Sequence, residues 1–280
     1  MSQRIITATD ALALAESGRP VTFLDVRSLP GSPSLRPEYE TAHIPGAHFV
    51  ELTTQLQSEP TGFSGNRPLP TREDLQVNLQ RWGVRADSAV VVYSNGTHGA
   101  SARAWFVLTW AGLNDVRYLD GGLPAWQAAG GPVSAEDPEE GGGTATVNEV
   151  GHLPVIDADG VQALLDSGSV VIDARKASKY RGDEVDDEGN RGHIPRAVSV
   201  PAGSLLAKDG TIRPAADLRE RFAELGVPAA EAVGVYCGGG VAAALETLIL
   251  TELGFDPRLF VGSFSAWASD PARPIAVTTS

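Results

Sequence analysis

The chain has 280 residues, enough for one large domain or two of ordinary size, and its 42% hydrophobic and 20% charged residues are typical of a folded, water-soluble protein. The formal net charge of −13 disfavours nucleic acid and anionic membranes as partners, because both repel a negatively charged surface. A single cysteine excludes an internal disulfide and leaves no Cys–His cluster for structural zinc, and no apolar stretch approaches the roughly 18 residues of a membrane span.

Short β-branched runs alternate with helical patterns along the chain. In the first half, residues 21–26, 90–93 and 116–119 are predicted as buried strands. Thr71 opens a helix with a capping-box-like pattern, and Gly83 ends it; in the second half, Pro214 leads a helix that stops at Gly226. Strands that alternate with helices predict parallel sheets covered by helices on both faces.

The two halves repeat four short motifs in the same order. The repeats are offset by 141 to 150 residues: Phe23-Leu24-Asp25-Val26-Arg27 with Val171-Ile172-Asp173-Ala174-Arg175, Ala42-His43-Ile44-Pro45 with Gly192-His193-Ile194-Pro195, Val91-Val92-Tyr93-Ser94 with Gly234-Val235-Tyr236-Cys237, and Gly121-Gly122-Leu123-Pro124-Ala125-Trp126 with Gly262-Ser263-Phe264-Ser265-Ala266-Trp267. Four matches in register indicate an internal duplication. An acidic, Pro- and Gly-rich stretch from Ser134 to Gly143 is typical of a linker that buries no core. We therefore predict one domain over 1–133, a linker over 134–151 and a second domain over 152–280.

Cys237 follows an apolar run and precedes three glycines and an alanine-rich helix. A thiol in that position faces backbone N–H groups and the positive end of a helix dipole, and both favour the reactive thiolate. The alternative is a small buried hydrophobic residue, as most free cysteines are. The glycine triplet favours the reactive thiol, because a packing cysteine does not need it.

These paired motifs resemble the tandem-domain rhodanese family of sulfurtransferases, over about residues 7–275. The resemblance implies an α/β fold with two tandem rhodanese-like domains, each a parallel β-sheet flanked by helices, of which only the second carries the catalytic cysteine. Here Cys237 has Ser94 at the matching place in the first copy, and we expect the loop after Ser94 to be longer and non-catalytic. The lack of a signal-peptide core and the single cysteine suggest a cytoplasmic location.

The resemblance further implies a two-step transfer without a metal or organic cofactor. The Cys237 thiolate takes a sulfane sulfur from a small anionic donor, becomes a persulfide, and passes the sulfur to cyanide or a thiol acceptor, for which a thioredoxin-like protein is a candidate. Backbone N–H groups would cradle the anionic sulfur and substrate, and the residues assigned to this cradle are Gly238, Gly239, Gly240, Val241 and Ala242. The loop Cys-Gly-Gly-Gly-Val-Ala is similar to the Cys-Gly-Ser-Gly-Val-Thr of 3-mercaptopyruvate sulfurtransferases. It lacks that pattern's two hydroxyls, and it also lacks the basic residues usual in thiosulfate sulfurtransferases, so 3-mercaptopyruvate is favoured over thiosulfate.

Two other functions are considered. One is a persulfide carrier or binding module that does not turn over, which the missing hydroxyls keep open. The other is a phosphatase of the same fold, which the sequence disfavours because Val241 to Ala244 supply no arginine to bind phosphate oxygens.

An anionic donor needs cations. By the resemblance, Lys179 occupies the position of an arginine that contacts substrate in the family, and Arg181 follows two residues later. Arg67 stands where mercaptopyruvate enzymes often carry a histidine. For each, an ordinary surface charge is the alternative; Arg191 and Arg196 are weaker candidates.

Several chemically attractive residues occur in both copies, including the one without the cysteine. We therefore predict structural roles for them: hydrogen-bonded buried histidines, internal ion pairs and packing tryptophans. They are His43, His193, Asp25, Arg27, Asp173, Arg175, Trp126 and Trp267.

Overall fold

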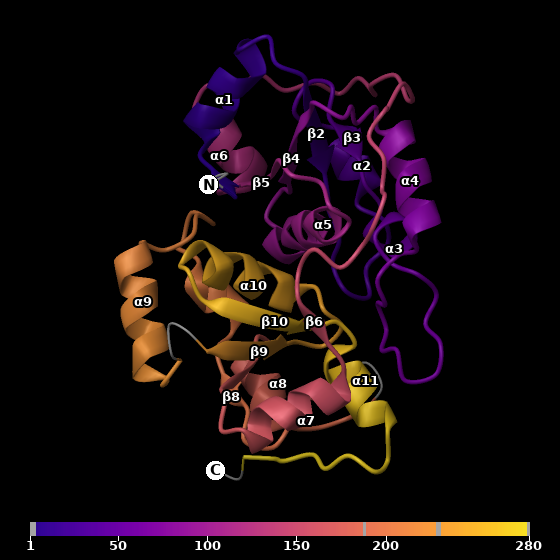
Figure 1. Ribbon diagram of the computed structural model, residues 1–280. Helices are drawn as coiled ribbons and strands as arrows, with labels where there is room; N and C mark the ends of the chain where they lie inside the picture. Colours follow the sequence, from indigo (N-terminus) through magenta and orange to yellow (C-terminus); the bar gives the residue numbers. More distant parts are fainter. Residues whose placement is uncertain (1–3, 187–188, 228–230, 279–280) are drawn as a thin grey trace. The chain divides into compact units, whose positions relative to one another are not determined.

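The computed structural model describes residues 4–186, 189–227 and 231–278 (Figure 1). The chain forms two compact units, and each unit includes a short segment from the other half of the sequence. Unit 1 comprises Met1–Ser58, Leu69–Leu153 and Lys208–Ile212; unit 2 comprises Glu59–Pro68, Pro154–Ala207 and Arg213–Ser280.

Unit 1 contains a five-stranded parallel sheet with the strand order β1-β5-β4-β2-β3. The central strand β4 is buried along its whole length, as expected for a parallel sheet covered on both faces. The elements are β1 (Ile5–Ile6), α1 (Ala8–Glu16), β2 (Val21–Asp25), α2 (Arg36–Tyr39), β3 (His48–Phe49), α3 (Leu52–Gln55), α4 (Arg72–Arg81), β4 (Ala89–Tyr93), α5 (His98–Trp110), β5 (Val116–Leu119) and α6 (Gly122–Ala128).

Unit 2 repeats this sheet strand for strand, in the order β6-β10-β9-β7-β8, and all its pairs are parallel. The strand β9 therefore corresponds to β4. The elements are β6 (Val155–Ile156), α7 (Ala158–Asp166), β7 (Val171–Asp173), α8 (Ala177–Arg181), β8 (Val198–Ser199), the 3-10 helix η1 (Ala202–Leu205), α9 (Ala215–Glu224), β9 (Ala232–Tyr236), α10 (Ala242–Glu252), β10 (Asp256–Phe260) and α11 (Ser263–Ser269).

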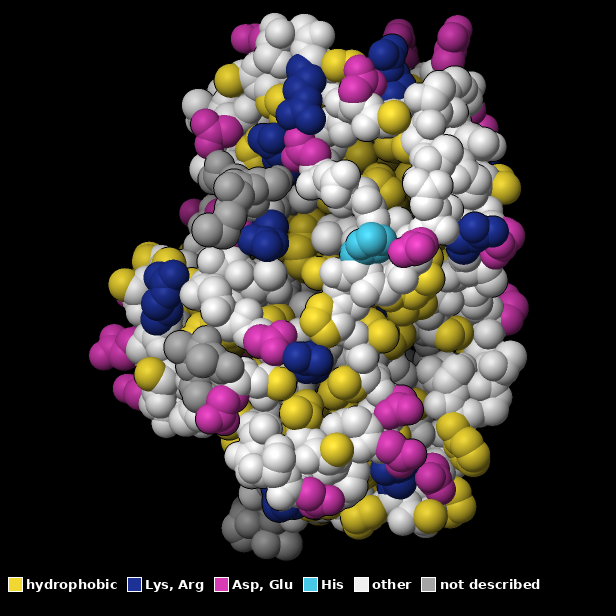
Figure 2. Space-filling model, viewed as in Figure 1, with side chains coloured by type: hydrophobic (Ala, Val, Ile, Leu, Met, Phe, Trp, Pro, Cys, Tyr) yellow, Lys and Arg dark blue, Asp and Glu magenta, His cyan; other side chains and the backbone are white. Residues whose placement is uncertain are grey.

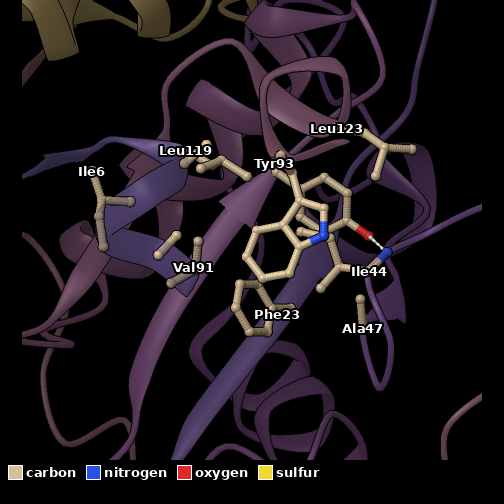
Figure 3. Packing of buried hydrophobic residues seen from close by; sticks show 11 residues of the cluster. Ile6, Phe23, Ile44, Ala47, Val91, Tyr93, Leu119 and Leu123 are labelled. Carbon is tan, nitrogen blue, oxygen red and sulfur yellow. Dashed lines mark hydrogen bonds between the residues drawn. The ribbon is translucent and has the colours of Figure 1, made fainter. Parts of the chain in front are cut away.

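Alternate strand residues build the core of unit 1 on one face of its sheet. Phe23, Val91 and Leu119 point into a cluster that also takes in side chains of α1 and α6, among them Trp126. Figure 3 shows this cluster, with the Ile44 N–H donating to Tyr93 Oη at 3.0 Å. Because side chains alternate along a strand, the intervening residues face the other side of the sheet, where α5 contacts β4 and β5.

The strands and helix ends that the sequence analysis predicted by residue number are confirmed. The three strands expected in the first half are β2, β4 and β5. Thr71 caps α4, because its hydroxyl accepts a hydrogen bond from the Asp74 N–H at 3.1 Å. Gly83 follows this helix with φ 63°, and Gly226 follows α9 with φ 73°, so both helices end at a glycine in the left-handed region.

The acidic connecting stretch belongs to unit 1. Ser134 pairs with His43 in an antiparallel bridge, and Glu140 forms an ion pair with Arg81 at 2.7 Å. Further along, Ala145 and Val147 are buried. The segment thus has little regular structure but does pack on a core, which its composition did not indicate.

None of the helices in the described parts of the chain is long and apolar enough to cross a membrane. On the face shown in Figure 2, Lys and Arg side chains are scattered, and most lie near Asp or Glu side chains. That face therefore presents no continuous basic surface.

Candidate functional site

Cys237 lies directly after the central strand β9, at the carboxyl edge of the unit 2 sheet. This edge is where parallel α/β sheets bind ligands. The cysteine is only 3% exposed. Five residues later α10 begins, and Val241 at its N-cap makes no side-chain hydrogen bond. The Ala244 N–H already donates to the Val241 carbonyl at 3.2 Å, and the positive end of the helix dipole faces the loop.

The sulfur accepts a hydrogen bond from the loop itself. The Gly240 N–H donates to Cys237 Sγ at 3.1 Å, and Gly240 has φ 77°, which other residues rarely adopt. Gly238 and Gly239 do not have such angles; a Cβ added at Gly238 would meet no atom within 4 Å. Of the three glycines, Gly240 is the one whose conformation turns an amide onto the sulfur.

The start of α11 holds the cysteine loop from the other side. The Cys237 N–H donates to Ser263 Oγ at 3.1 Å, and the Phe264 N–H donates to the Cys237 carbonyl at 2.9 Å. The Ser265 N–H donates to the Gly238 carbonyl at 3.0 Å. The backbone around the thiol is therefore fixed by a second segment, which gives a nucleophile a defined position.

Arg67 lies beside the same loop, within the segment of the first half that belongs to unit 2. A Cβ added at Gly239 would lie 3.2 Å from Arg67 Nη1, and the Asn66 N–H donates to Ser265 Oγ at 3.1 Å. A Cβ added at Gly65 would lie 2.3 Å from the Gly262 carbonyl oxygen, so this segment approaches the start of α11 backbone to backbone. Arg67 is half-buried there, not a free surface charge.

The other predicted cations lie elsewhere in unit 2. Lys179 is half-buried on α8, the helix that follows β7. Arg181 is exposed and forms an ion pair with Asp183 at 2.6 Å. Arg191 donates to the Gly182 carbonyl, and Arg196 donates to the Leu165 carbonyl and to Asp166. No described contact brings these four side chains to Cys237.

A buried charged network lies beneath the cysteine. Arg175 donates to both carboxylate oxygens of Asp173, and its guanidinium lies 4.0 Å from the centroid of the Phe264 ring. Burial works against the charge of Arg175, but the hydrogen bond and charge of Asp173 outweigh it, and Cys237 adds to them, so the pKa of Arg175 is raised above its ordinary value.

A scan against family models matches the chain to the "Rhodanese-like domain" twice, at residues 7–129 and 157–270. The chain belongs to the rhodanese family. The two matches and the two parallel sheets confirm the predicted fold class and the resemblance that the repeated motifs suggested.

The relatives of this rhodanese are sulfurtransferases by name. SseB of Mycobacterium tuberculosis, provisionally named thiosulfate sulfurtransferase, is 40% identical over 277 residues, which cover 98% of this chain and 96% of SseB. A protein of Pseudomonas aeruginosa provisionally named 3-mercaptopyruvate sulfurtransferase is 38% identical over 283 residues, 99% of both chains.

A solved structure agrees with these relatives. The crystal structure of SseA from Escherichia coli, described with the rhodanese fold and the catalytic mechanism of 3-mercaptopyruvate sulfotransferases, is 29% identical, with a TM-score of 0.82 over 94% of this chain and 100% of SseA. Together the relatives confirm the predicted enzyme class, sulfurtransferase.

The first rhodanese unit lacks the thiol but keeps the scaffold. Ser94 stands at the place of Cys237, is fully buried, and accepts a hydrogen bond from Ser101 Oγ at 3.3 Å. The expectation of a longer loop here is wrong: residues 94–97 join β4 to α5, whereas residues 237–241 join β9 to α10. The physical reason is that α5 begins directly at His98, while three glycines, poor helix formers, delay the start of α10.

The residues shared by both copies have the structural roles predicted for them. Arg27 pairs with Asp25 at 2.7 Å, as Arg175 pairs with Asp173 at 2.6 Å. The Nδ1 atoms of both histidines are hydrogen-bonded to backbone carbonyls at 2.8 Å, and both rings stack on tyrosines; the tryptophans lie in the two cores.

Sequence reasoning missed Ser263. A signal was present, because Ser263 replaces Gly122 of the first copy at a motif position, just as Cys237 replaces Ser94.

Arg258, the first basic residue after the cysteine, forms an ion pair with Asp256 at 2.8 Å at the start of β10. Arg258 therefore does not supply the phosphate-binding arginine that a phosphatase would need in the cysteine loop.

Proposed function

We propose that this protein is a cytoplasmic sulfurtransferase in which Cys237 carries the transferred sulfur as a persulfide. The observation that supports this best is the hydrogen bond from the Gly240 N–H to the Cys237 sulfur at the carboxyl end of the central strand. A backbone donor aimed at the sulfur stabilises a thiolate, which is the nucleophilic form. The buried site also limits access by water and unrelated oxidants.

The reaction has two displacement steps. The electron pair of the Cys237 thiolate forms a bond to the outer sulfur of the donor, and the bond that held that sulfur breaks with its pair going to the leaving group. Thiosulfate releases sulfite; 3-mercaptopyruvate releases the enolate of pyruvate, which takes up the proton given up by the mercaptan sulfur. Cyanide or a thiolate then attacks the outer persulfide sulfur and restores the Cys237 thiolate.

We propose 3-mercaptopyruvate as the preferred donor and thiosulfate as the alternative. The cradle, Gly238 to Ala242, stabilises the anionic persulfide sulfur through its backbone and carries no cation of its own. The donor carboxylate, separated from the sulfur by two carbon atoms, would then bind Arg67 beside Gly239. Lys179 is the second proposed donor-binding cation, whereas Arg181 is weaker because Asp183 already pairs with it.

The proposed acceptor is a small thiol or a thioredoxin-like protein. A persulfide recessed at 3% exposure of its cysteine is best reached by a slender nucleophile or by a thiol presented on a protruding loop. The alternative of a carrier without turnover is not retained, because the relatives over the full length are named as enzymes.

Steady-state kinetics with both donors test the proposal. Wild type, Cys237→Ser and the matched control Ser94→Ala are compared with cyanide and with a thiol as acceptors. We expect Cys237→Ser to lose turnover with every donor–acceptor pair and Ser94→Ala to keep it, since Ser94 occupies the equivalent buried place in the unit without the thiol. Full activity of Cys237→Ser would overturn the mechanism, and a higher kcat/KM for thiosulfate would reverse the donor assignment.

A further inference from the structure

We propose that Ser263 is a positioning residue for Cys237, whose hydroxyl holds the Cys237 N–H at rest and turns toward the sulfur when the sulfur becomes negatively charged. The proposal rests on the proposed function of Cys237 as the sulfur carrier. Ser263 itself exchanges no proton with the substrate and forms no covalent bond; it supplies one hydrogen-bond donor to a developing anion.

The first observation is backbone strain. Ser263 has φ 55°, and it shares a positive φ with only one other non-glycine residue, Arg196, among the residues that the structure describes. The equivalent residue of unit 1 is Gly122, with φ 60°, where a Cβ would lie 2.2 Å from the Ser94 carbonyl oxygen. The fold therefore favours glycine at this turn, and the unit with the thiol departs from it. Strained residues of this kind concentrate at functional sites.

The second observation is the set of contacts of the Ser263 hydroxyl, which is fully buried. Its oxygen accepts from the Cys237 N–H at 3.1 Å, and its proton is donated to the Phe260 carbonyl at 2.9 Å. The same oxygen lies 4.0 Å from Cys237 Sγ, too long for a full hydrogen bond with a thiol. At rest the proton therefore belongs to the Phe260 carbonyl.

A negative charge on the sulfur changes this balance. Hydrogen bonds to an ionised acceptor are about twice as strong as those between neutral groups, so an anionic sulfur competes with the Phe260 carbonyl for the one hydroxyl proton. Rotation of the hydroxyl and a small shift of the side chain suffice to redirect it. The Cys237 N–H, held on the Ser263 oxygen, keeps the two residues together during the change.

The third observation is the composition of the loop. Residues 238–242 are glycine, valine and alanine, so no side chain of the loop can donate to the sulfur. The Arg175 guanidinium is already bonded to Asp173 and to the Gly192 carbonyl. In the described part of the chain, the hydroxyl of Ser263 is the side-chain donor that the contacts place within 4.0 Å of Sγ. It complements the backbone donor of Gly240.

Two substitutions separate this role from a structural one. Ser263→Ala removes the hydroxyl but keeps a Cβ at positive φ, whereas Ser263→Gly removes the hydroxyl and relieves the strain, as Gly122 does in unit 1. The control Ser269→Ala removes a hydroxyl that donates to the Ala266 carbonyl at 2.9 Å, at the far end of the same helix. The readout is the rate of Cys237 alkylation by iodoacetamide at pH 7 and pH 10, with the melting temperature measured in parallel.

We expect both Ser263 variants to be alkylated about tenfold more slowly than wild type at pH 7, with a smaller difference at pH 10. Ser269→Ala is expected to behave as wild type. The Gly variant is expected to melt at or above the temperature of the Ala variant. Unchanged alkylation at pH 7, or slower alkylation only in the variant with the lower melting temperature, would overturn the proposal.

Alkylation needs no sulfur donor, so failure here is distinguishable from failure of the proposed function. If Cys237→Ser keeps its turnover, the function proposed for Cys237 is wrong whatever the Ser263 variants do. If Cys237→Ser is inactive and the Ser263 variants react as wild type does, only the role of Ser263 is wrong.

Discussion

Glu246, in the middle of α10, is expected to make the stability of this protein fall as the pH rises. The side chain is completely buried, and neither carboxyl oxygen has a hydrogen-bond partner among the described residues. Burial, and secondarily the negative charge of Asp173, raise the pKa of Glu246 well above its ordinary 4.5, with Arg221 opposing them. We therefore expect the folded chain to hold this proton to a higher pH than the unfolded chain does.

The sign and size follow from proton linkage. Above pH 4.5 the unfolded chain releases this proton while the folded chain keeps it, so the free energy of unfolding decreases with pH by up to about 1.4 kcal/mol per pH unit until the folded pKa is reached. Glu246→Gln removes the titration but keeps the size and polarity. Glu246→Leu also removes the unpaired oxygens, which corresponds to a gain of about 1–3 kcal/mol.

Thermal denaturation of wild type, Glu246→Gln and Glu246→Leu between pH 5 and pH 8 tests this. We expect the difference in melting temperature between the Gln variant and wild type to grow steadily with pH, by about 2–4 °C for each kcal/mol. The Leu variant is expected to be the most stable of the three at pH 8. A Gln–wild-type difference that stays constant across this range would refute the reasoning, because it would show that Glu246 titrates alike in the folded and unfolded chains.

Three further predictions concern the site and its scaffold. Arg67→Ala should raise the KM for the donor by about 10- to 100-fold, with Arg67→Lys in between because it keeps the charge but loses the bidentate fork; an unchanged KM would remove Arg67 from the site. Gly240→Ala should lower the melting temperature by a few degrees and reduce turnover, since φ 77° costs about 1–2 kcal/mol for a residue with a Cβ. The melting temperature of the control Gly238→Ala should stay near that of wild type. Asp25→Asn and Asp173→Asn should each lower the free energy of unfolding by about 3–5 kcal/mol in calorimetry, because each leaves a buried arginine unpaired. Only Asp173→Asn should also slow sulfur transfer. Equal effects of the two variants on turnover would contradict a purely structural role for Asp25.

The features that the sequence predicts well are those recorded in local patterns. The strand at 116–119 can be predicted because the pattern of hydrophobic residues in a strand indicates which faces of the sheet are buried. The helix cap at Thr71 and the glycine at 83 are local hydrogen-bonding and backbone effects, so they too can be seen in the sequence. The duplication adds an internal comparison, which identified the buried ion pairs as scaffold.

The features that it does not predict depend on packing partners. The local pattern of Glu59–Pro68 does not indicate that this segment belongs to the unit of the second half, a placement that puts Arg67 beside Gly239. Arg67 became a candidate through the family resemblance and not through its local pattern. Glutamate is a residue type that is usually exposed, but α10 is buried from Ala243 to Leu250 and Glu246 with it. Ser263 stands in a packing motif, and its meaning depends on a positive φ and a contact with residue 237, which a linear pattern does not record.

The most direct test of the central claim, that Cys237 carries the sulfur, is the mass of the protein after a brief reaction with 3-mercaptopyruvate in the absence of an acceptor. Wild type should gain the mass of one sulfur atom, located on the peptide that contains Cys237, and lose it on addition of cyanide. Ser94→Ala should do the same, and Cys237→Ser should gain nothing. Turnover in wild type without any sulfur gained on the Cys237 peptide, with either donor, would contradict the account.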